Sequence, residues 1–158
     1  MNHNSEQAVD LPRDVCHRRS AVACIALLAA LCCATAACSI AMPQSDNARA
    51  LADIASRHAG NEEVVEGTVI RVLPNSHGPS GLHERFIVDV HGAGASIPLY
   101  ITDNISVAAA APLRRGDHVV VKGELAFNDY GPLLHWTHRD PRMRHAPGFV
   151  EVDGRIYE

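Results

Sequence analysis

The segment from His135 to His145 holds the densest set of chemically reactive side chains in this sequence. It reads His-Trp-Thr-His-Arg-Asp-Pro-Arg-Met-Arg-His and contains three of the ten histidines, three arginines, one aspartate and the only tryptophan. Neutral imidazole is the commonest metal ligand in proteins, and it also titrates near physiological pH. This composition predicts a site that binds a metal ion or a small anion.

The candidate metal ligands are the histidines and the aspartate of this segment and one histidine from earlier in the chain: His83, His135, His138, Asp140 and His145. Nitrogen and oxygen ligands of this kind imply zinc or another divalent transition metal as the cofactor. The spacing matches neither the H-E-x-x-H helix nor paired C-x-x-C sites. The alternative is a structural turn, in which the histidines and Trp136 pack on a strand and the arginines face solvent.

The candidate anion-binding residues are four arginines: Arg85, Arg139, Arg142 and Arg144. Arginines beside a metal centre could stabilise charge on phosphate, while Asp140 or Glu84 handled protons. Two functions therefore stand as hypotheses. The first is a non-catalytic binding module of the cell envelope, and the alternative is a metal-dependent phosphodiester hydrolase. No spacing in the sequence requires catalysis, so the sequence leaves open whether the protein is an enzyme.

The first 38 residues predict an export segment. An apolar run from Ser20 to Ala37 follows His17-Arg18-Arg19, which is typical of a secretory signal. The run ends in Thr-Ala-Ala-Cys, which resembles a bacterial lipoprotein box with Cys38 as the lipidated residue. The alternatives are ordinary cleavage after Ala37 or Ala41 and a retained apolar anchor. The predicted location is the periplasm, with membrane contact only through this segment.

The rest of the chain is acidic and contains no cysteine. All five cysteines lie at or before position 38, so the remainder offers neither a disulfide nor a thiolate ligand. From Ser39 onward, 11 Lys and Arg residues stand against 15 Asp and Glu residues. Nucleic-acid-binding proteins usually carry a basic stripe and several exposed aromatic side chains. Nucleic acid is therefore not expected as a partner, and the ligand stays unknown.

Polar and apolar periodicity predicts one helix and then a chain of short strands. The helix is expected over residues 48–59, capped by Asp46 or Asn47 and stopped at Gly60. The alanine-rich stretch 102–113 is read as one short helix or an irregular connection. Strands are expected over residues 64–73, 83–90, 95–101, 118–127 and 133–137, with a terminal hairpin over 149–152 and 155–157.

This order predicts a mainly β protein, a small OB-like Greek-key barrel preceded by a short N-terminal helix. Residues 1–38 form the export segment, 39–62 the linker and helix, and 63–158 the barrel. OB barrels bind ligands between their first and fourth hairpin loops, here 74–82 and 128–132. An open β-sandwich is the competing architecture. The predicted core residues are Val69, Val72, Phe86, Val88, Leu99, Val119, Val121, Leu125, Leu134 and Trp136.

Several short stretches resemble a family of exported bacterial proteins known as domain of unknown function 3465, whose hallmark is the tetrapeptide HWTH. The stretches are Gly67–Pro74, His83–Ile87, Asn104-Ile105, Gly116-Asp117, Gly123-Glu124 and His135–His138. The resemblance covers roughly residues 64–157. It implies no particular activity, because the family name records none.

Overall fold

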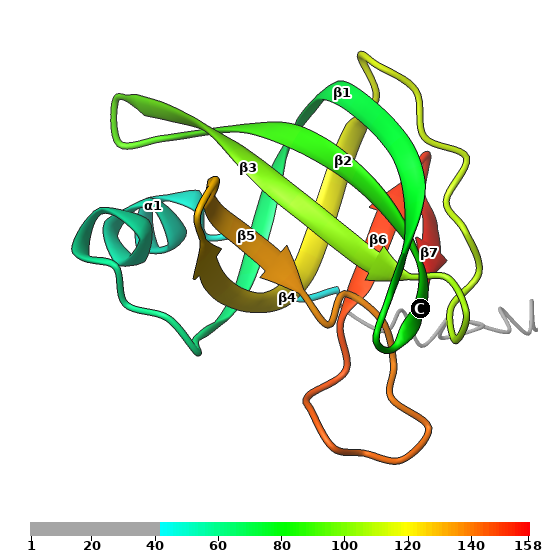
Figure 1. Cartoon of the computed structure of the whole chain (residues 1–158). Helices are drawn as coiled ribbons and strands as arrows, with labels where there is room; N and C mark the ends of the chain where they lie inside the picture. Colours follow the sequence, from blue (N-terminus) through cyan, green and yellow to red (C-terminus); the bar gives the residue numbers. More distant parts are fainter. Residues whose placement is uncertain (1–41) are drawn as a thin grey trace, which may run out of the picture. The chain divides into compact units, whose positions relative to one another are not determined.

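The computed structural model describes residues 42–158 (Figure 1). The predicted export segment and Cys38 lie outside this range. The predicted helix is present as α1, Asn47–Ser56. Asp46 caps it, because its side chain accepts a hydrogen bond of 3.0 Å from the Arg49 amide. The helix ends earlier than predicted, because Arg57 already adopts the left-handed conformation that terminates it, three residues before Gly60.

Seven strands follow the helix. They are β1 Glu62–Gly78, β2 Gly81–Gly92, β3 Ala95–Asn104, β4 His118–Asn128, β5 Gly131–His135, β6 Phe149–Val152 and β7 Arg155–Tyr157. The first hairpin loop is shorter than predicted, because β1 continues through Pro74 by means of a register shift between Leu73 and Ser76. The alanine-rich stretch after β3 forms an irregular connection, so the helix considered for it is absent.

Five of these strands close into a ring. Their hydrogen-bonded order is β1-β2-β3-β5-β4, and β4 pairs back with β1. All pairings are antiparallel except that of β3 with β5, where Tyr100 and Ile101 lie beside Leu133 and Leu134. The β6–β7 hairpin extends the sheet from β4. Because the sheet closes on itself, the open sandwich is not formed.

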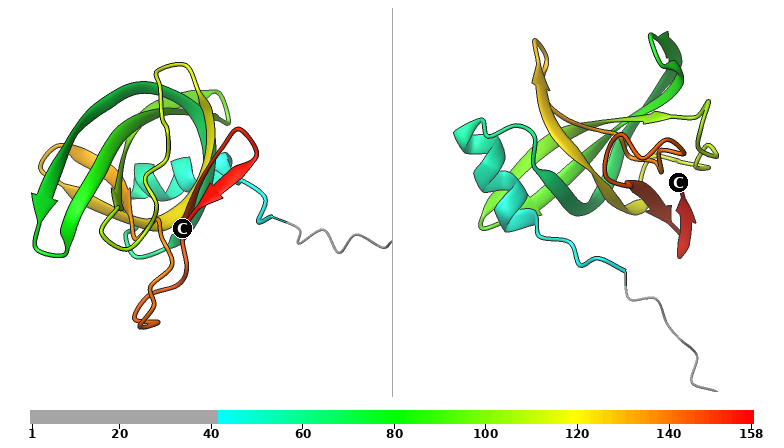
Figure 2. Two further views of the ribbon diagram at one scale, coloured as in Figure 1. Left: turned by 90° about the vertical axis from the view of Figure 1, so that its right-hand side faces the viewer. Right: turned by 90° about the horizontal axis from the view of Figure 1, so that it is seen from below.

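Helix α1 covers one open end of the ring. When the ring is viewed end-on, α1 crosses its opening (Figure 2, left). Ala50, Leu51 and Ile54 on one face of the helix are buried in the same apolar cluster as the inward side chains of the strands. Among residues 42–158, no helix has the length and apolar character needed to cross a membrane.

Eight of the ten predicted core residues are buried, and two are not. Val72 is 46 % exposed, because it lies beyond the register shift between Val69 and Arg71, in the last part of β1, where no side chain is buried. Trp136 is 39 % exposed, because the chain has already left β5 at that residue with a φ of 53°. The Trp136 error came from continuing the regular strand past its end at His135.

Candidate functional site

A groove of about 840 Å³ opens at the end of the ring away from α1. It lies between the β1–β2 turn, the end of β3 and residues 136–148, the loop that hangs below the ring in Figure 1 and is called the HWTH loop below. Its lining residues are Ser80, His83, Thr102, Asn104, Val107, Leu133, His135, Trp136, His138, Asp140, Pro141, Arg142, Arg144 and His145. All five predicted metal ligands therefore line one groove.

The two ends of the HWTH loop, where it leaves and rejoins the sheet, lie in close backbone contact. Trp136 starts it in the left-handed region, which a bulky side chain rarely adopts. At its end, the Gly148 amide donates a hydrogen bond of 3.0 Å to the His138 carbonyl. A side chain at Gly148 would meet the Trp136 carbonyl oxygen at 2.2 Å. The groove wall therefore depends on an irregular backbone that strand periodicity could not predict.

Asp140 stabilises the HWTH loop by accepting hydrogen bonds from other residues of the same loop. Its Oδ1 accepts a hydrogen bond from the Arg142 amide, and its Oδ2 accepts bonds from the amide and Nε of Arg144, each 2.9 Å long. The side-chain hydrogen bond from Arg144 is the main reason that the pKa of Asp140 lies well below its usual range. Both carboxylate oxygens are thus already engaged inside the loop, so the geometry gives Asp140 a structural role.

Aromatic contacts order the rings on the groove wall. Trp136 stacks between His135 and His145, with ring centroids 4.4 Å and 4.9 Å away. His138 meets His145 edge to face at 4.9 Å between centroids. The sequence did not indicate this stack, because it depends on a turn that brings residues nine apart together.

The hydrogen bonds of His138 and His145 determine which ring nitrogens are available. His138 Nδ1 lies 3.1 Å from the Arg139 carbonyl oxygen, and His145 Nδ1 lies 2.8 Å from the Ala146 carbonyl oxygen. A carbonyl oxygen only accepts, so each Nδ1 carries a proton and donates it. Burial lowers the pKa of His138 and favours its neutral form. In that form its Nε2 is a bare acceptor.

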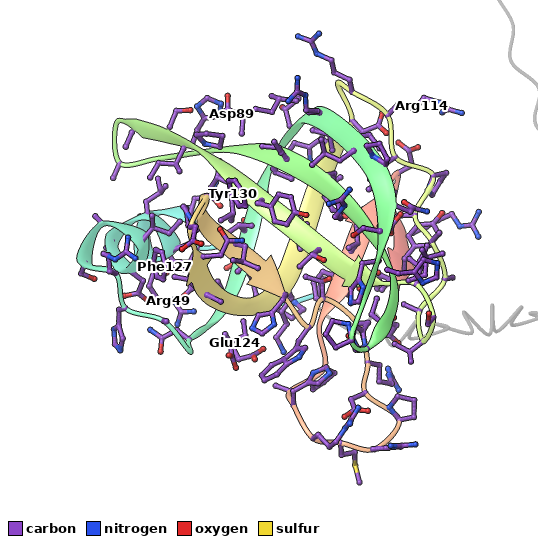
Figure 3. All side chains as sticks on the ribbon, in the orientation of Figure 1. Arg49, Asp89, Arg114, Glu124, Phe127 and Tyr130 are labelled. Carbon is purple, nitrogen blue, oxygen red and sulfur yellow. The ribbon has the colours of Figure 1, made fainter. Side chains whose placement is uncertain are left out.

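The other two histidines have different partners. His83 Nε2 lies 3.1 Å from Ser80 Oγ, and charge on His83 contributes to the lowered pKa of His138. His135 Nε2 lies 3.5 Å from Glu124 Oε1, and Figure 3 shows Glu124 beside the start of the HWTH loop. Within residues 42–158, no three His, Asp or Glu side chains are placed so that they could hold one metal ion. The five-residue metal site stays a prediction.

The four predicted anion-binding arginines do not act together. Arg85 donates to the Pro74 carbonyl oxygen through Nε and Nη2, at 2.9 and 2.6 Å. Arg139 pairs with Glu158. Neither lines the groove, whereas Arg142 and Arg144 do. Among the ion pairs of the described residues, none involves the Arg142 guanidinium.

Of the two hairpin loops predicted to flank the ligand site, only the first borders this groove, and the site itself stays a prediction. Ser80 of the first loop lines the groove, but no residue of the 128–132 turn does. That turn lies at the end of β4 and β5 nearer α1 (Figure 1). The HWTH loop takes its place as the second wall.

A family model described as "Protein of unknown function (DUF3465)" matches residues 33–158. The chain belongs to this family. No curated protein matches the chain. The match takes in every residue that lines the groove, so the groove is part of the DUF3465 domain itself.

A buried acidic pair that was not predicted from the sequence lies beneath the groove of this DUF3465 domain. Glu84 on β2 lies directly opposite Asp103 on β3, and both are buried. Asp103 Oδ1 accepts a hydrogen bond of 2.9 Å from Thr137 Oγ1 of the HWTH loop, while its Oδ2 has no partner within residues 42–158. Glu84 Oε1 accepts one of 3.0 Å from the Ala111 amide.

Burial, more than the nearby Glu84, raises the pKa of Asp103 to about 7. The signal for this pair was present in the sequence. Asp103 follows Leu99 and Ile101 at a period of two, which places it on the inward face of the strand.

Proposed function

We propose that this DUF3465 protein is an exported, non-catalytic binding module whose groove takes a small organic anion. The observation that supports this most directly is the charge of the groove lining. Arg142 and Arg144 face one acidic residue, Asp140, and that carboxylate is saturated by hydrogen bonds from its own loop. A ligand carboxylate or phosphate would supply the missing partner for Arg142.

The remaining lining suits a ligand with both polar and apolar parts. Val107, Leu133 and Trp136 give the groove an apolar wall, while Ser80 and the histidines provide polar atoms. Mostly apolar walls with a few convergent polar groups are typical of small-molecule sites. This favours an organic anion over a bare inorganic ion.

The alternative of a metal-dependent phosphodiester hydrolase has less support. It needed Asp140 or Glu84 to move protons at the reacting centre. Asp140 is committed to Arg142 and Arg144, and Glu84 does not line the groove. Neither carboxylate is placed for general acid–base chemistry in the groove.

We also propose that the barrel has an OB-like Greek-key topology. The closed ring of five strands and the parallel pairing of β3 with β5 support it. OB barrels commonly carry their ligands on surface loops around a rigid ring. The HWTH loop and the β1–β2 turn would fill that role here.

Replacement of Arg142 is expected to weaken anion binding. Isothermal titration calorimetry of the full chain with citrate and with phenyl phosphate, at constant ionic strength and with chelator present, should show binding to the wild type. Arg142→Gln should bind about tenfold more weakly or worse, because one charge-assisted hydrogen bond contributes about 1.5–3 kcal/mol. Arg114→Gln is the matched control, since Arg114 is exposed and lies outside the groove. Equal losses in both variants would indicate only nonspecific charge attraction.

The exported location has its own test. Cells expressing the full chain should contain a mature form that begins at Cys38 and carries the mass of a lipid modification. Intact-mass spectrometry of the membrane fraction measures this, and Cys38→Ala should abolish the added mass. Cleavage after Ala37 or Ala41 without lipid would leave export and remove anchoring. A cytosolic protein that keeps Met1 would contradict the export proposal.

A further inference from the structure

We infer that His138 and His145 form a two-histidine site for one divalent transition-metal ion, which they bind through their Nε2 atoms. The ligand class is an ion that prefers imidazole, such as zinc or cobalt. The metal site would lie in the same groove as the proposed anion site. An experiment can exclude either site without excluding the other. Of the five metal ligands predicted from the sequence, only these two histidines are kept.

The hydrogen bonds of the two rings carry this inference. In metal sites a ligating histidine usually donates its other ring N–H to a backbone carbonyl or a carboxylate, which fixes its tautomer and orientation. His138 and His145 both do so, through Nδ1 to the carbonyl oxygens of Arg139 and Ala146. Each Nε2 is thereby left as the atom able to ligate.

The rings are also close together and held in place. Their centroids are 4.9 Å apart, near the separation expected for two imidazoles that share one zinc at about 2.0–2.1 Å per nitrogen. The stack with Trp136 holds the His145 ring, and the bond from the Gly148 amide to the His138 carbonyl holds the backbone beside the other ring. Little conformational freedom is lost on binding.

The other predicted ligands differ from this pair. His135 Nε2 faces Glu124, His83 Nε2 faces Ser80, and both oxygens of Asp140 accept hydrogen bonds within the loop. Two protein ligands leave coordination positions for water or for an anion in the groove. A metal held in this way would add positive charge where Arg142 already lies, and it would strengthen the binding of an organic anion.

The test uses the single tryptophan as a local reporter. Trp136 stacks against His145, so a paramagnetic ion bound there should quench its fluorescence, whereas ions bound away from the His135–Trp136–His145 stack should not. The full chain is first treated with N-ethylmaleimide, which caps the five cysteines and removes thiolate ligands. Titration with Co(II) should then give saturable quenching that EDTA reverses.

His138→Gln and His145→Gln should each shift the midpoint of this titration at least about tenfold to higher Co(II). His58→Gln and His118→Gln are the controls, because both histidines are exposed and lie outside the groove. Thermal melts of every variant show whether it folds. Absence of saturable quenching in the wild type, or unchanged quenching in folded His145→Gln, would overturn the inference.

A measurement on the wild type alone avoids any folding defect of a variant. Long-range 1H–15N spectra of histidine-labelled protein should show His138 with its proton on Nδ1, and Zn(II) should shift the Nε2 signals of His138 and His145. A Zn(II) response confined to other histidines would contradict the site. Anion binding is measured with chelator present and therefore does not depend on a bound metal. Failure of the metal site can thus be distinguished from failure of the proposed function.

Discussion

The free energy of unfolding is expected to fall as the pH rises from about 4 to 7. Asp103 is fully buried, and its pKa is raised to about 7 by that burial. The folded state therefore keeps a proton on Asp103 that the unfolded chain releases near pH 4. A raised folded pKa of an acid means stability that is present at low pH and lost as the pH approaches the folded pKa. The slope contributed by this group is at most about 1.4 kcal/mol per pH unit.

Urea denaturation at several pH values, on the wild type and on Asp103→Asn, measures this effect. The amide keeps an acceptor for the Thr137 hydroxyl and cannot ionise, so the variant should lose the slope and exceed the wild type in stability at pH 8. Burial also raises the pKa of Glu63 and Glu84 and lowers that of His138. These groups remain in both proteins, so the difference between the two reports on Asp103 together with its interaction with Glu84. Parallel pH profiles would contradict the prediction.

Replacing Gly148 with alanine is expected to be the most destabilising single-methyl change in the described chain. The new Cβ would lie 2.2 Å from the Trp136 carbonyl oxygen, 2.6 Å from the Lys122 carbonyl oxygen and 2.7 Å from Thr137 Cα. All three atoms belong to the backbone, so none can move aside without disturbing β4 or the HWTH loop. Overpacking of this kind costs roughly 3 kcal/mol or more, and Tm should fall by roughly 10 °C or more.

Gly78→Ala is the matched control for this change. Its Cβ would approach only the His83 ring, at 3.3 and 3.4 Å, and a side chain of this kind can adjust. Differential scanning calorimetry compares the two variants with the wild type. A Gly148→Ala melting temperature within the error of the Gly78→Ala value would contradict the close backbone packing around Gly148.

The strand pattern was predictable because the inward side chains keep a period of two. Val119, Val121 and Leu125 on β4 alternate without interruption, and all are buried. The closing pairs could not be predicted in this way. The pairing of β4 with β1 joins residues fifty or more positions apart, and only the folded chain brings Val65 beside Val121. The bulge after Val69 likewise has no clear signal in the local sequence.

The sequence indicated which residue types gather at the candidate site, but not the role of each residue. Residue types alone indicated the HWTH loop, and its histidines do line one groove. The part played by each residue depends on backbone groups that the sequence does not reveal. The Arg142 and Arg144 amides engage Asp140, and a carbonyl oxygen orients His138. Arg139 was grouped with Arg142 by proximity in the chain, yet its partner is Glu158 at the C-terminus.

The indole N–H of Trp136 tests most directly whether the groove beside the HWTH loop binds a small organic anion. Because the chain has one tryptophan, its side chain gives one indole signal in a 1H–15N spectrum. Titration with citrate and phenyl phosphate, at constant ionic strength and with chelator present, should shift this signal saturably in the wild type and in Arg114→Gln. The shift should be lost or strongly weakened in Arg142→Gln. An indole signal that does not move, or that moves equally with chloride, would contradict the account.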